Sequence, residues 1–338
     1  MKEAMLYAKR DDGKVSCFLC SHRCVIAEGK RGVCNVRLNR NGTLFTLAYG
    51  KVIARHVDPI EKKPLFHFLP GSFSYSIATV ACNFRCSFCQ NWEISQYKDD
   101  EPVLPGSPLS PETAVEEASA SGCSSIAYTY TEPTIFFEYS YDIAVLAHKK
   151  GIKNVFVTNG YQTPETIEKM NGVIDAANVD LKSFSDEFYR KMCSARLQPV
   201  LDAIKLMHEA GIHVEVTTLV VPGRNDSDEE LTQVARFLAQ ISPDIPWHVS
   251  RFYPNYQETK TLPTPRETIC RAVRIGRQEG IRYVFSGNLP GEGDEDTACP
   301  QCGEVVIARV GYSVDIRRLD ANRCGNCGVG LPIIIDAE

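Results

Sequence analysis

The segment ACNFRCSFCQNWEIS, residues 81–95, carries Cys82, Cys86 and Cys89 within one short stretch. A structural zinc site closes with four ligands, and the next cysteine, Cys123, lies too far along the chain to belong to the same loop. The spacing therefore predicts either a centre completed by a ligand from elsewhere or a centre with one open coordination position. An open position implies chemistry at the metal, because a structural site has no use for it.

Length and composition limit the classes of protein that this chain can be. It has 338 residues, a formal net charge of −5 and 43% hydrophobic residues, which suits one large domain with small appendages. A mildly acidic chain without a long Lys/Arg block gives no reason to expect a nucleic-acid partner. The amino-terminal stretch has no apolar core of signal-peptide length, and no apolar run is long enough to span a bilayer. We therefore expect a cytoplasmic protein without a membrane partner.

The chain contains 14 cysteines, most of them in groups. Clustered cysteines in a reducing compartment are typical of metal or iron–sulfur ligands, whereas a disulfide framework is typical of small secreted chains. Besides the three-cysteine loop, the groups are Cys17, Cys20, Cys24 and Cys34 near the amino terminus and Cys299, Cys302, Cys324 and Cys327 near the carboxyl terminus.

Between residues 74 and 285, short apolar runs alternate with amphipathic stretches, which predicts an α/β fold with a parallel sheet covered by helices. Six such units suit a partial (β/α)6 barrel, TIM-like but open, better than an eightfold one. We expect a Cys-rich segment over 1–72, the barrel core over 73–290 and a four-cysteine ribbon over 291–338. The predicted strands are 74–80, 125–131, 154–159, 176–182, 213–221 and 247–253, and the predicted helices include 112–122, 141–151, 199–211 and 227–240.

The three-cysteine loop directly follows the first predicted strand, where parallel folds place their chemistry. With Phe88 before the last cysteine, it resembles the CxxxCxΦC motif of radical S-adenosylmethionine (SAM) enzymes. The resemblance implies a [4Fe–4S] cluster on Cys82, Cys86 and Cys89 whose fourth iron binds SAM. It also implies an electron donor such as reduced ferredoxin or flavodoxin, and a 5′-deoxyadenosyl radical that abstracts hydrogen from a substrate. The alternative is a zinc knuckle completed by a remote ligand.

Other segments resemble SAM-binding segments of the same enzymes, above all those of glycyl radical activating enzymes. TYTEPT (129–134) resembles a Gly-Gly-Glu segment in which two glycines are replaced, while VTNG (157–160), DLK (180–182) and VVPGRND (220–226) follow in the expected order. Strand alternation places Asp180 and Lys182 on one face. Cys193 follows the DLK segment and is a candidate catalytic thiol, although a packed cysteine is the commoner finding. The residues that the resemblance assigns to SAM are Phe88, Glu132, Asn159, Asp180, Lys182 and Tyr253.

Nearly the whole chain resembles the radical SAM component of the AmmeMemoRadiSam system. The matching segments include residues 17–37, 49–71 and RFYPNY (251–256). This resemblance implies AMMECR-type and Memo-type proteins as partners. Two alternatives stay open: an activating enzyme of a glycyl radical enzyme, and a non-catalytic metal-binding interaction module.

The two outer cysteine groups are expected to hold metals of their own. The CPQCG and CGNCG pairs, separated by a predicted hairpin, favour a closed four-thiolate zinc ribbon, although rubredoxin-type iron uses the same ligands. The amino-terminal four have a spacing that differs from the bacterial ferredoxin run and are compatible with zinc or an auxiliary iron–sulfur cluster. His22 lies close enough in the sequence to compete as a ligand there.

Overall fold

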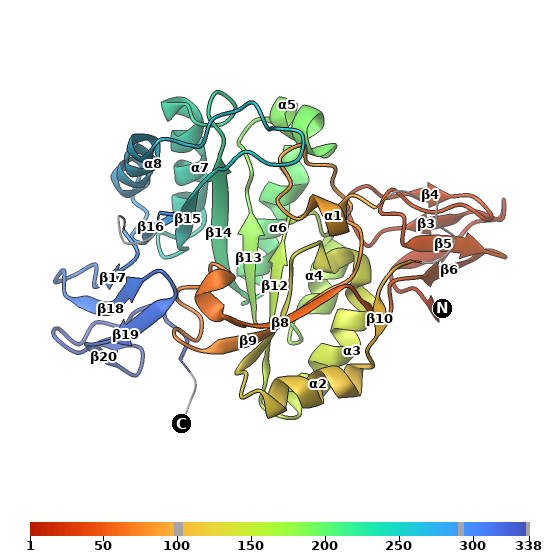
Figure 1. Ribbon diagram of the computed structural model, residues 1–338, viewed down its shortest axis with the longest axis horizontal. Helices are drawn as coiled ribbons and strands as arrows, with labels where there is room; N and C mark the ends of the chain where they lie inside the picture. The colour runs from red at the N-terminus through yellow and green to blue at the C-terminus, as the bar shows by residue number, and fades with distance from the viewer. Residues whose placement is uncertain (98–103, 290–293, 336–338) are drawn as a thin grey trace.

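The computed structural model describes residues 1–97, 104–289 and 294–335. A central sheet with its helices is flanked at one end by small amino-terminal strands and at the other end by small carboxy-terminal strands (Figure 1). The two flanking four-cysteine groups therefore lie on opposite sides of the central part.

The amino-terminal part consists of two small antiparallel sheets, with strand orders β1-β6-β5 and β2-β3-β4. Asn41 and Gly42 join β5 to β6 with left-handed φ values of 55° and 69°, as an Asn-Gly pair in a tight turn favours. The strands are β1 (Lys2–Glu3), β2 (Tyr7–Lys9), β3 (Val15–Cys17), β4 (Val25–Ile26), β5 (Arg37–Arg40), β6 (Thr43–Thr46) and β7 (Lys51–Val52), which pairs with β10 (Ser107–Pro108).

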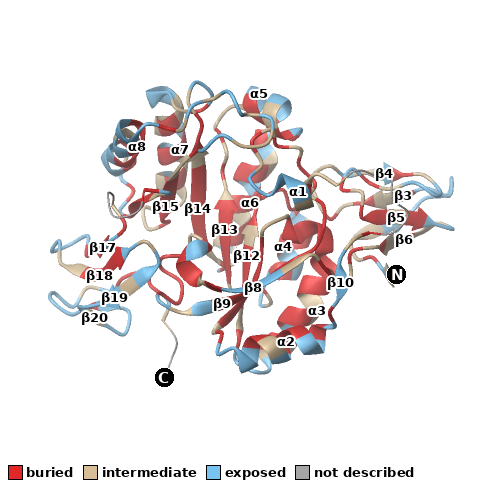
Figure 2. Cartoon of the chain, in the orientation of Figure 1, coloured by how far each residue is buried: buried red, intermediate tan, exposed pale blue. Residues whose placement is uncertain are grey.

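The central sheet confirms the predicted α/β fold. Within the described residues it has eight strands in the order β16-β15-β14-β13-β12-β11-β9-β8, and every neighbouring pair is parallel except β8 with β9. Its inner strands are buried on both faces, as a helix-covered parallel sheet requires (Figure 2). The strands are β8 (Ala54–Pro59), β9 (Phe73–Ala78), β11 (Ser125–Tyr128), β12 (Lys153–Thr158), β13 (Ala176–Asp180), β14 (His213–Val220), β15 (Trp247–Arg251) and β16 (Val284–Gly287).

Two edge strands of this sheet go beyond the six that the sequence predicts. β16 adds a further parallel strand, and β8 pairs antiparallel with β9 although it lies before residue 72. The sheet thus includes residues on both sides of residue 72, where the first predicted domain ends. The division into three domains stays a prediction.

Three of the helices, α2, α4 and α7, begin after a side chain that caps them. Ser110, Thr163 and Ser227 each accept a hydrogen bond from the backbone N–H three residues on, and a proline follows the first two. The helices are α1 (Trp92–Ser95), α2 (Pro111–Ala120), α3 (Phe137–His148), α4 (Pro164–Met170), α5 (Asp186–Phe188), α6 (Leu197–Glu209), α7 (Asp228–Ile241) and α8 (Arg266–Gln278), with 3-10 turns η1 (Ile60–Lys62) and η2 (Pro133–Phe136) and a π-helical turn η3 (Tyr189–Cys193).

Residues 60–69, here called the plug segment, connect β8 to β9 and pack against the sheet. Leu65 and Phe68 are buried against Ala127, Val155 and Ala176 of the strands β11, β12 and β13. The small alanine side chains leave room for these larger residues. The plug segment lies toward the amino ends of the strands, since Ala176 is the first residue of β13.

A buried carboxylate fastens the plug segment to the sheet. Glu215 on β14 accepts hydrogen bonds from the backbone N–H groups of Phe66 (3.0 Å) and His67 (2.7 Å), and from Nε2 of His213 (3.0 Å) and His248 (2.6 Å). Burial alone would raise the pKa of Glu215, but the two histidine hydrogen bonds outweigh it, and the pKa lies well below its ordinary value. The carboxylate is therefore ionised and paired.

The carboxy-terminal strands form a small module that is hydrogen-bonded to the plug segment. Arg309 on β18 donates from Nη2 to the carbonyl of Phe66 (2.6 Å). The backbone N–H of Leu69 donates to the carbonyl of Ile334 (2.7 Å), and the N–H of Ile334 donates to the carbonyl of His67 (2.8 Å). The hairpin β18–β19 confirms the predicted one. The strands are β17 (Thr297–Ala298), β18 (Val305–Val310), β19 (Ser313–Ile316), β20 (Leu319–Asp320) and β21 (Arg323–Cys324). The Gly- and acid-rich stretch GNLPGEGDEDTAC (287–299) is typical of a linker before this module, and its residues 290–293 lie outside the described residues.

A search of the helices in the described residues finds none with the length and apolarity that crossing a bilayer requires.

The buried imidazole of His67 should make the free energy of unfolding depend on pH. Burial lowers the pKa of His67 to about 3, so between about pH 6.5 and 3 the unfolded chain binds a proton that the folded chain does not. Stability is therefore lost as the pH falls below 6.5, by roughly 2 kcal/mol at pH 5 from this group. His67→Phe should show a shallower loss in urea unfolding between pH 7 and 5. His208→Gln on α6 serves as the control, and equal slopes for His67→Phe and wild type would contradict the assignment.

Candidate functional site

The loop that carries Cys82, Cys86 and Cys89 starts after the carboxyl end of β9 and runs into α1. Cys86 is buried, and Cys82 and Cys89 are half-buried. The loop supports its sulfurs with donors: the N–H of Phe84 lies 3.3 Å from Sγ of Cys82, and the hydroxyl of Ser95 lies 3.1 Å from Sγ of Cys89. The loop geometry therefore suits sulfur atoms that carry negative charge.

The three thiols are not gathered around a single ion. Four sulfurs around one zinc lie about 3.8 Å apart, given Zn–S bonds of about 2.3 Å in a tetrahedron. Across the described ranges, Cys299, Cys302, Cys324 and Cys327 form the one group of three or more cysteine, histidine or acidic residues whose ligand atoms all lie within 4.8 Å of one another. A cluster is larger than an ion and holds its thiolates further apart, so a cluster on Cys82, Cys86 and Cys89 stays a prediction that this spacing permits.

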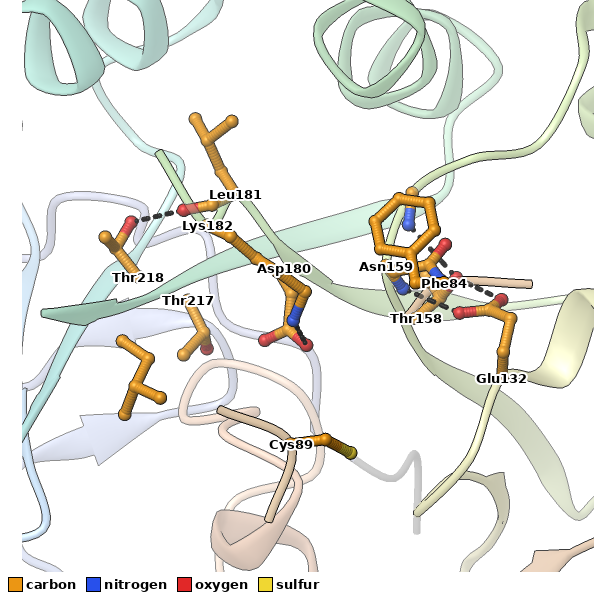
Figure 3. Close-up of polar contacts among 12 residues, drawn as sticks. Phe84, Cys89, Glu132, Thr158, Asn159, Asp180, Leu181, Lys182, Thr217 and Thr218 are labelled. Carbon is orange, nitrogen blue, oxygen red and sulfur yellow. Dashed lines mark hydrogen bonds and ion pairs between the residues drawn. The ribbon is translucent and has the colours of Figure 1, made fainter. Parts of the chain in front are cut away.

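Asp180 and Lys182 come together at the end of β13, as strand alternation predicts. Nζ of Lys182 lies 2.9 Å from the Asp180 carboxylate (Figure 3). It also lies 5.9 Å from the ring centroid of Phe88. Burial lowers the pKa of Lys182, but the charges of Asp180, Cys86 and Cys193 outweigh it and raise the pKa well above its ordinary value. A permanent cation thus stands beside the cysteine loop.

Glu132 lies at the start of η2, with its carboxylate buried and surrounded by donors. It accepts hydrogen bonds from the backbone N–H of Thr134 (3.0 Å), from the hydroxyl of Thr158 (2.7 Å) and from the backbone N–H of Asn159 (2.8 Å). Figure 3 shows the contacts to Thr158, the last residue of the neighbouring strand β12, and to Asn159, which comes directly after it. Glu132 therefore holds the β12 loop in place, and its contact with SAM stays a prediction.

Asn159 links that loop to the cysteine loop. Its Nδ2 donates to the side-chain oxygen of Asn83 (2.7 Å) and lies 3.8 Å from Sγ of Cys82. The sequence does not indicate this role for Asn83, because an asparagine next to a cysteine carries no chemical signal of it.

Tyr130 stands where the Gly-Gly-Glu segment that TYTEPT resembles has a glycine. Its backbone conformation is one that favours glycine. Tyr130 adopts a left-handed φ of 64°, which is uncommon for a side chain of this size. Its hydroxyl donates to Asp58 and the ammonium of Lys63 lies 4.6 Å from its ring centroid. Asp58 also binds the Lys63 ammonium at 2.6 Å. These buried contacts, from a segment distant in sequence, hold the strained tyrosine in place.

The remaining predicted residues differ in their surroundings. Phe88 is buried and packs on Phe188, with ring centroids 5.8 Å apart. Tyr253 is 43% exposed and accepts a hydrogen bond from Arg251. Cys193 is fully buried at the end of η3, and its proximity, together with burial, raises the pKa of the Cys86 thiol. The carbonyl oxygen of Cys193 also accepts a hydrogen bond from the backbone N–H of Arg85 in the cysteine loop (2.9 Å).

The two outer cysteine groups differ in geometry. In the carboxy-terminal group, Sγ of Cys299 lies 3.6 Å from that of Cys327, and Sγ of Cys302 lies 3.7 Å from that of Cys324. These separations match a tetrahedron around one ion.

The amino-terminal four, Cys17, Cys20, Cys24 and Cys34, line one narrow cavity without gathering as closely. His22 does not line this cavity; its Nε2 contacts the backbone oxygen of Asn83 at 2.8 Å.

Comparison with known proteins agrees with this site. The family model described as "Radical SAM superfamily" matches residues 76–238, which include the cysteine loop and β13. The chain is 45% identical to the uncharacterized protein MJ0808 of Methanocaldococcus jannaschii, over 99% of this chain and 100% of that protein. It is 22% identical to the pyruvate formate-lyase 1-activating enzyme of Escherichia coli (strain K12), over 60% of this chain and 88% of that enzyme.

A solved structure supports the fold. The crystal structure of Streptococcus suis SuiB bound to precursor peptide SuiA aligns with a TM-score of 0.50 at 15% identity, covering 68% of this chain and 51% of that one. Together with the family match over the cysteine loop, these relatives establish that the chain is an enzyme belonging to the radical SAM superfamily, whose members use a [4Fe–4S] cluster and SAM.

Proposed function

We propose that this enzyme cleaves SAM reductively at a cluster on Cys82, Cys86 and Cys89 and abstracts hydrogen from a partner protein or a small molecule. The observation that carries the proposal is the three-thiol loop at the end of β9, which is not gathered around one ion and faces the Lys182 cation. When bound, the cluster supplies the electron that breaks the S–C5′ bond of SAM.

Several residues around the cysteine loop are assigned to different parts of the SAM molecule. Asp180 and Lys182 present opposite charges 2.9 Å apart, which suits the paired amino and carboxylate groups of the SAM methionine moiety. Glu132 positions Asn159, whose amide lies beside Cys82. Phe88 supports Lys182 by its ring, and exposed Tyr253 is assigned to the ribose side of SAM.

Cys193 acts on the cluster rather than on the substrate in this proposal. Its side chain is fully buried next to Cys86, so a substrate would have no access to it without a rearrangement. A thiol donor beside a cluster ligand tunes the reduction potential of the cluster. We therefore assign Cys193 as a positioning residue.

The physiological setting follows from the sequence resemblance. Segments 17–37, 49–71 and 251–256 support membership of the AmmeMemoRadiSam system, with AMMECR-type and Memo-type proteins as partners and reduced ferredoxin or flavodoxin as electron donor. A second candidate is activation of a glycyl radical enzyme. The named activity of the Escherichia coli relative favours it.

Cleavage of SAM should require the cysteine loop. Anaerobically reconstituted wild type, reduced with dithionite in the presence of SAM, should release 5′-deoxyadenosine, and Cys86→Ala should release none because one cluster ligand is lost. Cys270→Ala, an exposed cysteine on α8, is the matched control and should behave as wild type. If wild type carries a full cluster yet neither responds to SAM nor cleaves it, a non-catalytic metal-binding module becomes the better interpretation.

The charged pair should matter for SAM and not for the cluster. Asp180→Asn and Lys182→Met should each weaken SAM binding by about 10- to 100-fold, since a hydrogen bond to a charged group contributes about 1.5–3 kcal/mol. The visible absorption of the cluster should stay intact, because neither side chain is a ligand. Lys205→Met, an exposed charge on α6, provides the control. Unchanged SAM affinity in both variants would remove the pair from the binding site.

The carboxy-terminal group should hold one zinc ion that is redox-silent. Replacing Cys302 and Cys327 with alanine in the full chain should remove one zinc per chain in elemental analysis and leave the iron content unchanged, because thiolate separations of 3.6–3.7 Å suit a single ion. Cys270→Ala again serves as the control. Loss of one iron in place of zinc would assign a rubredoxin-type centre instead.

A further inference from the structure

The amino-terminal cysteine group has the features of a built metal centre. Cys17, Cys20, Cys24 and Cys34 line a narrow, largely enclosed cavity whose other walls are apolar or come from Arg37. The cavity lies between the two small amino-terminal sheets, since Cys17 belongs to β3 and Arg37 to β5. Four thiols that surround one enclosed space can act as a complete ligand set.

The spacing of these four thiols argues against a single ion. Within the part of the chain that the structure describes, no three of them fall within 4.8 Å of one another, whereas the carboxy-terminal four all do. The same structure therefore contains one group closed to the size of an ion and another whose thiols stand further apart around a narrow cavity. Thiolates that are further apart than those around a single ion are the arrangement that an iron–sulfur cluster requires.

Arg37 supplies a second, independent observation. Its side chain is 2% exposed and pairs with Glu138 at 2.9 Å, and it donates from Nη2 to the carbonyl of Met5 at 2.5 Å. Its Nε is buried and has no hydrogen-bond partner among the described residues. A buried donor without an acceptor is costly, and the bridging sulfides of a cluster would accept its hydrogen bond.

We propose that Cys17, Cys20, Cys24 and Cys34 ligate a second iron–sulfur cluster, of the [4Fe–4S] class, which lies beside Arg37. The ligand set closes with four cysteines, so this cluster has no open iron for SAM. The site goes beyond the proposed SAM reaction and does not depend on it, because it rests on residues outside the SAM-binding loop.

Direct contacts join this site to the SAM-binding loop. Nε2 of His22, between Cys20 and Cys24, lies 2.8 Å from the backbone oxygen of Asn83, the residue after Cys82. Arg85 donates to the carbonyl oxygens of Cys82 (2.7 Å) and of Val33 (2.9 Å), the residue before Cys34. Both cysteine loops thus share one hydrogen-bonded wall, which places a second one-electron centre next to the first.

Metal counting tests the proposal without any enzyme assay. The full chain with Cys82, Cys86 and Cys89 replaced by alanine, purified without oxygen, should retain about four irons and four sulfides per chain, with zinc confined to the carboxy-terminal group. Adding Cys20→Ala and Cys34→Ala should remove that iron, and adding Cys270→Ala instead should not. An iron-free triple variant that carries two zinc ions per chain would overturn the proposal.

If the triple variant fails to fold, the metal content of the wild-type protein tests the same proposal. About eight irons and one zinc per chain supports the second cluster, whereas about four irons and two zinc ions assigns zinc to the amino-terminal site. Failure of the proposed function would appear separately, as wild type with full metal content that does not cleave SAM.

Discussion

The carboxylate of Glu215 fixes the amino end of the barrel, and the placement of the site at the opposite end depends on it. An ionised carboxylate without solvent is tolerated only when hydrogen bonds and opposite charges surround it. Glu215 meets this requirement by binding the plug segment and two histidines on β14 and β15. The plug segment in turn binds Arg309, so one buried charge connects the barrel to the carboxy-terminal module. With one end closed in this way, the loops at the other end are free to carry the chemistry.

Much of the barrel could be predicted because its strands are buried on both faces and appear as short apolar runs. All six predicted strands and the four quoted helices are present within a few residues of their expected bounds. β8 escaped prediction because His56 and Val57 are exposed and the run Ala54–Pro59 has no apolar periodicity. β16 is only four residues long, which makes it hard to recognise in the sequence. The plug segment could not be foreseen, since its partners are Glu215 and the module around Arg309, both far away in the chain.

The candidate site shows the same division between local and distant information. Cysteine spacing, and the alternation of Asp180 and Lys182 along β13, are local and predicted the pair that the structure contains. The environment of Glu132 is not local, because its donors come from Thr158 and Asn159 on the next loop. Tyr130 is a sharper case: nothing in TYTEPT indicates that a tyrosine can replace glycine there. The replacement is possible because Asp58 at the end of β8 and Lys63 in the plug segment hold it in a left-handed conformation.

Cysteine spacing in the sequence and thiol spacing in the structure carry different information. Two CxxC pairs brought together by a hairpin place their sulfurs 3.6–3.7 Å apart, which is the size of an ion. The thiols of the CxxxCxxC loop and of the amino-terminal four do not all lie within 4.8 Å of one another, although their sequence spacing alone left zinc open for both. Sequence establishes that thiolates gather, while the backbone between them sets the size of what they enclose. For this chain, thiol spacing separates one group closed to the size of an ion from two groups for which we propose iron–sulfur clusters, one of them with a free position for SAM.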